Sequence, residues 1–414
     1  MTVAITGIGI ASPLGFGHER FWQALCEGRS GVRAIDDAYR RDGVPSLGAP
    51  LSEPPGKRRA ASPKLRRADT LSRTIAGAAR EALADAGFDP ADMALARLGL
   101  VVGSAYGNLH ESAVHLQRLF TRGAPAVSPL LFPNLVVNAP AAYAAMELSA
   151  GSEAMGTNLT ISQLEISGEC AVIAGADLVR SGQADVVVAG GGDEISEILV
   201  EVYRRAGALS GQAGGEEWSS PYDRARTGVV LGEGSAMLVL ETAKRARTRG
   251  RTIYAEIESD VLFSIESPPY DVPTRPGAAA DRIRAEFGAA TDGVDLVCGA
   301  ANSSLRFDRL ELELLADLLG EHARHAWLTS IKGATGEHGS AGALTIAAAA
   351  LALWAQAVPP LCNLREPEHG ALFRFAGRTA TAAQLKSALV AGIARGGAGA
   401  ALLLRRAGSG PCSA

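Results

Sequence analysis

Few side chains in this sequence have the type and spacing that metal binding or thiol chemistry requires. The chain has 414 residues and five cysteines: Cys26, Cys170, Cys298, Cys362 and Cys412. Their number is odd, and no two have the short paired spacing of a zinc site. We therefore expect reduced thiols, no metal and no cofactor. An isolated buried cysteine behaves as a small apolar residue, and we expect that role for Cys170.

Charge and hydropathy argue against some classes of partner. Forty basic and 44 acidic residues leave a net charge of −4, which gives no reason to expect binding to nucleic acid or to an anionic membrane. Glycine, proline and charged residues interrupt every apolar run before it reaches the ~18 residues of a membrane span. Residues 1–7 have no basic segment and are typical of a strand rather than a signal peptide. We expect a cytoplasmic protein.

Short apolar runs alternate with segments rich in alanine, leucine, glutamate and arginine. Runs that are apolar on both faces are typical of strands covered by helices on both sides, so this alternation predicts a layered α/β architecture. Residues 343–357 are almost wholly apolar, which predicts a helix buried between layers. We expect strands at 3–10, 98–102, 184–189, 236–240, 294–298 and 400–404, and helices at 76–86, 171–181 and 310–319.

The segment 41–67 differs in composition from its surroundings. It contains five prolines, and six basic residues lie between 57 and 67. We interpret it as a surface excursion with a basic edge. The simplest interpretation is a solvated loop, and the alternative is a docking site for an acidic partner. We expect residues 408–414 to form a frayed tail.

Four blocks of sequence carry recognisable motifs. The chain opens with VAITGIGIASPLG at 3–15, and GTNLTIS follows at 156–162, before Ser167 and Gly168. The third block is PYDRARTG at 221–228, and the fourth is SIKGATG at 330–336. Together they resemble the β-ketoacyl-acyl-carrier-protein synthases, the condensing enzymes of fatty-acid and polyketide synthesis. The third block is highly specific, and the blocks span nearly the whole chain in the family's order.

The resemblance implies the thiolase-like fold, a five-layer αβαβα architecture built from two similar α/β halves. The N-terminal half would cover residues 1–250 and the C-terminal half residues 251–407. Family members place a cysteine nucleophile at the N-terminus of a buried helix, where the aligned peptide dipoles lower the thiol pKa. Two histidines supply N–H donors that stabilise the enolate formed when a malonyl group loses carbon dioxide.

This sequence departs from the family at each of those positions. Glu165 stands where the family has its cysteine, and a carboxylate is a poor nucleophile toward a thioester. Ala300 stands at the first histidine position. Either Glu337 or His338 stands at the second, and we prefer Glu337. Arg395 replaces a phenylalanine that gates acyl entry, and an arginine cannot act as an apolar lid without desolvating its charge.

Three charged residues of the family pattern are retained, namely Asp308, Glu311 and Lys332. We expect them to be structural, forming a buried or half-buried ion pair that holds the two halves together. Since the nucleophile and both oxyanion donors are replaced, the resemblance implies a condensing-enzyme scaffold without condensing chemistry.

The chain is most similar to the cysteine-lacking chain-length-factor subunits of type II polyketide and polyene synthases. Such a subunit would form a heterodimer with an active β-ketoacyl synthase. It would shape the tunnel that holds the growing acyl chain. That chain is attached to the phosphopantetheine of acyl carrier protein. The residues that would line the tunnel or interface are Phe120, Leu131, Phe132, Tyr143, Met146 and Arg395. Any one of the first five is equally consistent with simple core packing.

Carrier proteins are acidic, so the basic edge of the segment 41–67 is a candidate docking site. Its residues would be Arg58, Arg59, Arg66 and Arg67. Two other functions remain open. In the first, Glu165 makes the protein a malonyl-carrier-protein decarboxylase, or pairs with His338 as acid and base in another acyl reaction. In the second, a homodimer binds acyl chains or carrier protein without processing them.

Overall fold

Two sets of strands with the same topology form one large mixed sheet in the computed structural model, which describes residues 1–36, 39, 46–52, 62–89, 97–149 and 156–408. In spatial order the first set is β6-β5-β7-β8-β1 and the second is β11-β10-β15-β16-β9. In each set two parallel pairings are followed by two antiparallel ones. The first set comprises β1 (Val3–Ser12), β5 (Leu98–Gly103), β6 (Asn158–Ile161), β7 (Val186–Asp193) and β8 (Gly234–Thr242). The second comprises β9 (Ala255–Ser264), β10 (Leu296–Cys298), β11 (Trp327–Thr329), β15 (Ser387–Ile393) and β16 (Ala398–Arg405).

The two sets meet where β1 pairs antiparallel with β9, through Val3–Ile5 and Ala255–Ile257. Shorter strands extend this sheet or form small separate ones. They are β2 (Gly15–Phe16), β3 (Arg33–Ala34), β4 (Leu47–Gly48), β12 (Ala357–Val358), β13 (Arg374–Phe375) and β14 (Thr381–Ala382).

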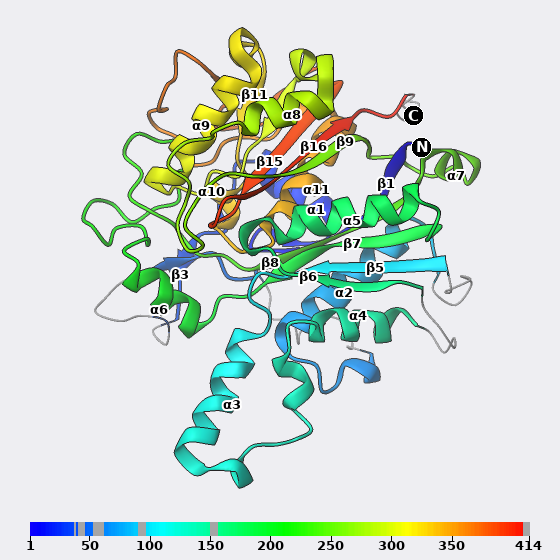
Figure 1. Cartoon of the computed structure of the whole chain (residues 1–414), viewed down its shortest axis with the longest axis vertical. Coiled ribbons are helices and arrows are strands. Elements are labelled where there is room, and N and C mark those ends of the chain that lie inside the picture. Colours follow the sequence, from blue (N-terminus) through cyan, green and yellow to red (C-terminus); the bar gives the residue numbers. More distant parts are fainter. Residues whose placement is uncertain (37–38, 40–45, 53–61, 90–96, 150–155, 409–414) are drawn as a thin grey trace.

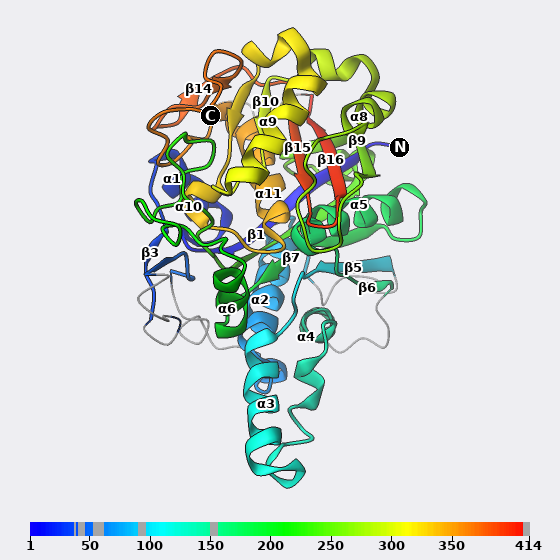
Figure 2. The same cartoon turned by 60° about the vertical axis from the view of Figure 1, so that its left-hand side comes forward.

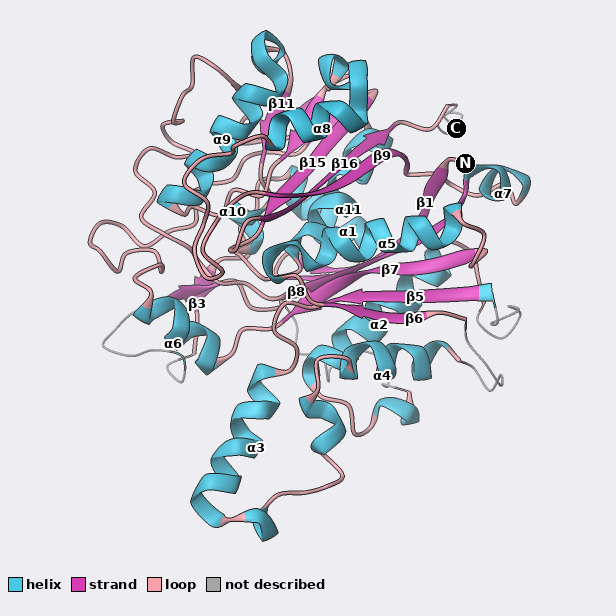
Figure 3. Cartoon of the chain, in the orientation of Figure 1, coloured by secondary structure: helices cyan, strands magenta, loops and turns pink. Residues whose placement is uncertain are grey.

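Helices cover both sets of strands and also fill the space between them (Figure 1). One outer layer contains α2 (Thr70–Asp85) and α4 (Ala139–Leu148), and the other contains α8 (Ala279–Phe287) and α9 (Leu305–Leu319). The central layer contains α5 (Ser167–Arg180) and α11 (Ala341–Ala355), each of which contacts strands of both sets. Figure 3 shows the resulting alternation of helical and strand layers. The predicted five-layer αβαβα fold with two similar halves is therefore confirmed.

The central helix α11 shows why the layers can pack so closely. Residues 341–353 are all buried, as expected for the apolar run 343–357. Each predicted strand and helix coincides with an observed element, although the boundaries shift by a few residues. Four strands of the two sets, β6, β9, β11 and β15, were not among the predicted elements. Polar and apolar residues are mixed along β9, so it has no continuous apolar run.

The remaining elements connect the layers and build the surface around the pocket. They are α1 (His18–Cys26), α6 (Glu197–Arg205), α7 (Ala243–Thr248), α10 (Lys332–Thr335) and the 3-10 turns η3 (Pro63–Leu65), η8 (Leu164–Ile166), η9 (Gly288–Gly293) and η10 (Gly320–Arg324). None of the helices in the described ranges is long and apolar enough to cross a bilayer. Arg58, Arg59, Cys412 and the predicted tail from residue 409 onward lie outside the described residues.

One segment projects away from the layered body. It runs from α3 (Leu109–Arg122) through η6 (Ala124–Ala126) and η7 (Phe132–Leu135) to Asn138, and we call residues 109–138 the arm. Both Figure 1 and Figure 2 show α3 extending beyond the sheet and its covering helices. No residue of α3 is buried. The helix α3 therefore adds no buried side chain to the core, and Asn134 of η7 is buried.

The contact between α5 and α11 depends on glycine. A Cβ atom at Gly168 would lie 2.6 Å from the Ala343 nitrogen and 2.7 Å from the Ser340 oxygen, both of them backbone atoms. We expect Gly168→Ala to lower the free energy of unfolding by more than about 2 kcal/mol, because the two helices would have to separate. Gly77→Ala in α2 is the control, since a Cβ there meets nothing within 4 Å. It should raise stability by about 0.5–1 kcal/mol. Urea denaturation measures the free energy of unfolding of both variants. Equal changes in Gly168→Ala and Gly77→Ala would contradict this account of the helix contact.

Candidate functional site

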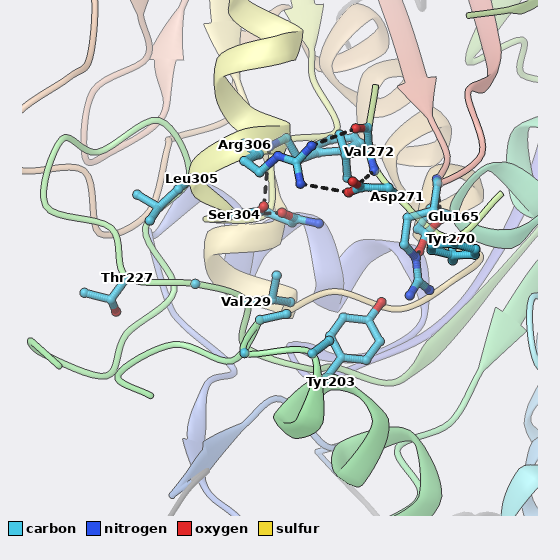
Figure 4. Close-up of a pocket in the computed structure, with 17 residues that line it drawn as sticks. Glu165, Tyr203, Thr227, Val229, Tyr270, Asp271, Val272, Ser304, Leu305 and Arg306 are labelled. Carbon is cyan, nitrogen blue, oxygen red and sulfur yellow. Dashed lines mark hydrogen bonds and ion pairs between the residues drawn. The ribbon is translucent and has the colours of Figure 1, made fainter. Parts of the chain in front are cut away.

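A cavity of about 330 Å³ opens between α6, the N-terminal end of α9 and the loops around them. One end is exposed, where Arg306 donates to the Asp271 carboxylate at 2.8 Å and to the Val272 carbonyl at 3.1 Å. The other end is buried, and its walls include Glu165, Tyr203 and Arg395. Figure 4 shows the Arg306 contacts and, across the cavity, Tyr203 projecting from α6. The cavity thus runs from the surface to the position of Glu165.

Glu165 lies in the turn η8, immediately before α5. Its neighbour Leu164 has a positive φ of 48°, a conformation that few non-glycine residues adopt. This sharp turn places Glu165 at the start of α5, where the positive end of the helix dipole favours a carboxylate. The Glu165 side chain is 10% exposed. The cavity therefore meets a carboxylate at the N-terminal end of a buried helix.

Arg395 holds both oxygens of that carboxylate. The Arg395 Nε donates to Glu165 Oε1 at 2.7 Å, and the Arg395 backbone N–H donates to Oε2 at 3.1 Å. Arg395 Nη2 also donates to the Tyr106 hydroxyl at 2.6 Å, and that hydroxyl lies 3.4 Å from the hydroxyl of Tyr203. We call Glu165, Arg395, Tyr106 and Tyr203 the inner cluster. Burial raises the pKa of both tyrosines, which keeps their hydroxyls protonated.

A tight turn between β15 and β16 fixes the backbone of Arg395. Gly396 and Gly397 follow it with φ values of 81° and 83°. A Cβ at Gly397 would lie 1.8 Å from the carbonyl oxygen of Ile265, so this turn requires glycine. The Gly396 N–H also donates to the Asp271 carbonyl at 2.9 Å. Arg395 is thus presented to Glu165 from a turn that has little freedom to move.

The loop that carries Ala300 is held by the retained acids of α9. Glu311 accepts hydrogen bonds from the N–H groups of Ala300 and Ala301 and from the Tyr222 hydroxyl. Asp308 accepts from the N–H groups of Tyr222 and Asn302. The methyl side chain of Ala300 offers no hydrogen-bond donor, and its backbone N–H is already bonded to Glu311. Burial raises the pKa of Asp308 to about 6 and that of Glu311 to about 7.

The retained lysine forms a different ion pair from the one the sequence suggested. Lys332 Nζ donates to Glu337 Oε2 at 2.7 Å, whereas Asp308 pairs with Arg226 at 3.4 Å. Burial alone would lower the pKa of Lys332, but attraction to Glu337 outweighs it and the pKa lies above its usual value. The expectation that Lys332, Asp308 and Glu311 form one ion pair is therefore wrong. Arg226 with Asp308 is one of several ion pairs that join the two halves, and Glu165 with Arg395 is another.

The two candidates for the second histidine position have different surroundings. Glu337 accepts hydrogen bonds from Lys332 and from the Asn302 side-chain amide, each at 2.7 Å. His338 is buried, and neither ring nitrogen has a hydrogen-bond partner among the described residues. Burial, reinforced by the Lys332 charge, lowers its pKa to about 3, so the imidazole is neutral. Neither Glu337 nor His338 lines the cavity that ends at Glu165.

The described cysteines do not supply a thiol to this cavity. Cys26, Cys170, Cys298 and Cys362 are free, and none of them lines it. Burial raises the pKa of these four thiols to about 11 or 12. Cys170 lines a separate apolar cavity of about 360 Å³ on another side of α5. In the described ranges, no cluster of His, Cys, Asp and Glu is arranged to hold a metal ion.

The residues predicted to line a tunnel or interface lie on the arm and on α4. Phe120 is 81% exposed, Phe132 and Met146 are also exposed, and Leu131 and Tyr143 are half-buried. None of these five lines the cavity at Glu165, whereas Arg395 does. Arg66 and Arg67, from the predicted docking site, are exposed. The Arg67 carbonyl accepts from Asn134 of the arm at 2.9 Å, so this basic edge lies beside the arm.

Sequence reasoning missed Tyr106, Tyr203 and Glu169. Tyr106 follows the end of β5, where side chains next to a parallel strand commonly enter a site. Glu169 lies one helical turn after Glu165 and is buried, with its Oε2 unpaired among the described residues. Burial raises the Glu169 pKa to about 7. The i, i+4 spacing from Glu165 was the available signal for Glu169.

Models of the two domains of β-ketoacyl synthases match most of the chain. The N-terminal domain model covers residues 1–246 and the C-terminal domain model covers residues 266–365. A 3-oxoacyl-[acyl-carrier-protein] synthase 2 of Coxiella burnetii is 29% identical over 98% of both chains. The tetracenomycin polyketide synthase ketoacyl synthase alpha subunit of Streptomyces glaucescens is 33% identical, over 98% of this chain and 97% of its own length.

A solved structure has the same fold over nearly its whole length. It is described as the ishigamide ketosynthase/chain length factor and superposes with a TM-score of 0.88 at 27% identity. The alignment covers 98% of this chain and 99% of that one. The thiolase-like ketosynthase architecture is therefore shared from end to end.

The Glu165–Arg395 pair should be energetically coupled. We expect Glu165→Ala and Arg395→Ala each to lower the free energy of unfolding by about 1–3 kcal/mol, because each leaves a partly buried charge without its partner. The loss of unfolding free energy in the double variant should be smaller, by about 1–2 kcal/mol, than the sum of the losses in the two single variants. The exposed pair Arg282 and Glu286 of α8 is the control and should couple by about 0.5 kcal/mol or less. Additive losses at 165 and 395 in urea denaturation would contradict the pairing.

Glu169 should make stability depend on pH. Its pKa is raised from 4.5 in the unfolded chain to about 7 in the folded one, so its contribution is complete below pH 4.5 and is lost as pH rises through 7. Relative to Glu169→Gln, wild type should therefore lose about 3 kcal/mol of unfolding free energy between pH 4.5 and pH 8. Glu286→Gln, at an exposed site, should follow the wild-type pH curve. Parallel curves for wild type and Glu169→Gln would show that Glu169 is ionised throughout this range.

Proposed function

The chain belongs to the β-ketoacyl synthase family, and from this premise we propose that it acts in the elongation of carrier-protein-bound acyl chains as a subunit without condensing activity of its own. Its partner in this proposal is an active β-ketoacyl synthase, with which it forms a heterodimer of the chain-length-factor type. The growing polyketide or polyene chain, held by acyl carrier protein on its phosphopantetheine, lies in a tunnel that the two subunits shape together.

The observation that carries this proposal is the engagement of Glu165. Both of its oxygens accept hydrogen bonds from Arg395 at the buried end of the cavity. No described cysteine lines that cavity, and all four described thiols have pKa values of about 11 or 12. Condensation needs a thiolate to accept the acyl group, and at neutral pH these thiols are protonated.

The surroundings of the oxyanion positions also support a silent subunit. Ala300 has no side-chain donor, and its N–H is already bonded to Glu311 at 2.6 Å. Glu337 has a carboxylate where a donor would be needed, and that carboxylate is bound by Lys332. An enolate placed beside a carboxylate would be repelled rather than stabilised. This argues against the decarboxylase alternative as well as against condensation.

The exposed apolar surface favours a protein partner. The arm exposes Leu116, Phe120, Leu130, Phe132, Val136 and Val137, and the adjoining helix α4 exposes Met146. The strand β6 lies at the end of the sheet, with Leu159 exposed on it. Exposed apolar side chains near a strand at the end of a sheet are typical of a subunit interface. The similar ishigamide protein is described as a ketosynthase together with a chain length factor.

The exposed Arg66 and Arg67 support the proposed docking of an acidic carrier protein. They lie beside the arm, through the bond between the Arg67 carbonyl and Asn134. A carrier protein bound there would be adjacent to the surface that the proposed partner subunit covers. Charge complementarity of this kind mainly speeds association and sets orientation.

The experiment is intact-protein mass spectrometry of the purified chain, alone and co-expressed with its candidate synthase, after incubation with malonyl carrier protein. The chain alone should neither gain an acyl group nor convert malonyl to acetyl carrier protein, and the pair should elongate. Glu165→Ala should leave elongation by the pair within about twofold of wild type, because Glu165 performs no chemical step.

The control is Glu286→Ala, an exposed substitution on α8. Decarboxylation by the chain alone that stops in Glu165→Ala but continues in Glu286→Ala would make Glu165 catalytic and overturn the proposal. A stable homodimer that binds carrier protein but does not associate with any synthase would favour the acyl-binding alternative instead.

A further inference from the structure

The buried end of the cavity is polar and, taken as a unit, electrically neutral. The inner cluster combines one carboxylate, one guanidinium and two phenols in a single hydrogen-bonded chain. The Arg395 guanidinium also lies 5.2 Å from the centre of the Tyr203 ring. Other residues that line the cavity are apolar, among them Val229, Val272 and Phe307. A ligand in this cavity can therefore contact both apolar side chains and the charged pair.

An apolar group cannot take the place of Arg395 without a penalty. Moving the guanidinium away would leave Glu165 buried and without its cation, and an uncompensated buried charge is strongly unfavourable. The backbone cannot yield easily either, because the Arg395 N–H is itself bonded to Glu165 and two glycines fix the turn that follows. The inner cluster therefore keeps an apolar acyl chain from occupying the place of Arg395.

A carboxylate is compatible with the same surroundings. A guanidinium has five N–H donors in a planar fork that suits carboxylate oxygens. The hydrogen bonds of Arg395 to described residues use Nε and Nη2. Its Nη1 donates to none of the described residues, and Arg395 lines the cavity. A short ligand that ends in a carboxylate can thus bind Arg395 without displacing Glu165.

We propose that the inner cluster makes this cavity selective: it accepts a thiol arm that carries a short carboxyacyl group and rejects one that carries an apolar acyl chain. Arg395 and Glu165 are the specificity-determining residues. This inference rests on the proposed function, because it takes the ligand to be the phosphopantetheine arm of a carrier protein.

The experiment uses amide analogues of malonyl-pantetheine and octanoyl-pantetheine, which cannot be hydrolysed or decarboxylated through a thioester. Isothermal titration with the purified full chain should show at least tenfold tighter binding of the malonyl analogue. In Glu165→Ala/Arg395→Phe, which removes both charges together, the preference should reverse by at least tenfold. Glu165→Gln/Arg395→Met retains side-chain volume and is the second variant, for use if the first fails to fold.

The matched control is Arg282→Ala/Glu286→Ala, which removes an equivalent ion pair from the exposed face of α8. Its preference for the malonyl analogue over the octanoyl analogue should equal that of wild type. The proposal is overturned if wild type binds both analogues within threefold, if it binds neither, or if the preference is unchanged in the folded double variants. Condensation by the chain alone, measured by mass spectrometry, tests the proposed function separately and does not depend on this ratio.

Discussion

The close contact of α5 with α11, made possible by Gly168, positions the buried end of the cavity. Glu165 lies in the turn that leads into α5, and Glu337 and His338 lie just before α11. A shift of α5 would therefore move Glu165, and a shift of α11 would move Glu337 and His338. The small residues of α11 allow the two sheet regions to approach its whole circumference, which is why the helix can be buried on every side. Packing in the central layer thus determines the geometry of the polar groups.

Charge compensation follows from that burial. Glu165 and Glu337 each have a cation of their own, Arg395 for Glu165 and Lys332 for Glu337. Buried carboxylates without such partners would be driven toward their neutral forms, as burial does at Glu169. Glu165 and Arg395 are therefore best understood as one unit. Replacing Glu165 alone with a neutral residue would leave the Arg395 guanidinium without its carboxylate.

The layered fold and its central helix could be predicted from the sequence because they depend on apolar runs, which are local. Glu165, Arg395 and Glu337 were singled out by comparison with the family's motifs, and Glu165 and Arg395 line the cavity. Their partners could not be predicted in the same way. Tyr106 is 289 residues from Arg395 in the sequence, and Lys332 pairs with Glu337 rather than with the retained acids. Such pairings are set by side-chain direction in the folded chain, and sequence spacing does not encode that direction.

The arm has a consequence for how such proteins diversify. Since no residue of α3 is buried, substitutions along its outer surface have little effect on the stability of the layered body. The exposed positions of α3 can therefore change quickly while the core remains constrained. In the proposed heterodimer, a lineage could acquire a new companion subunit by altering this one projecting segment, and exchanging the arm between relatives would then exchange their pairing preference without rebuilding either fold.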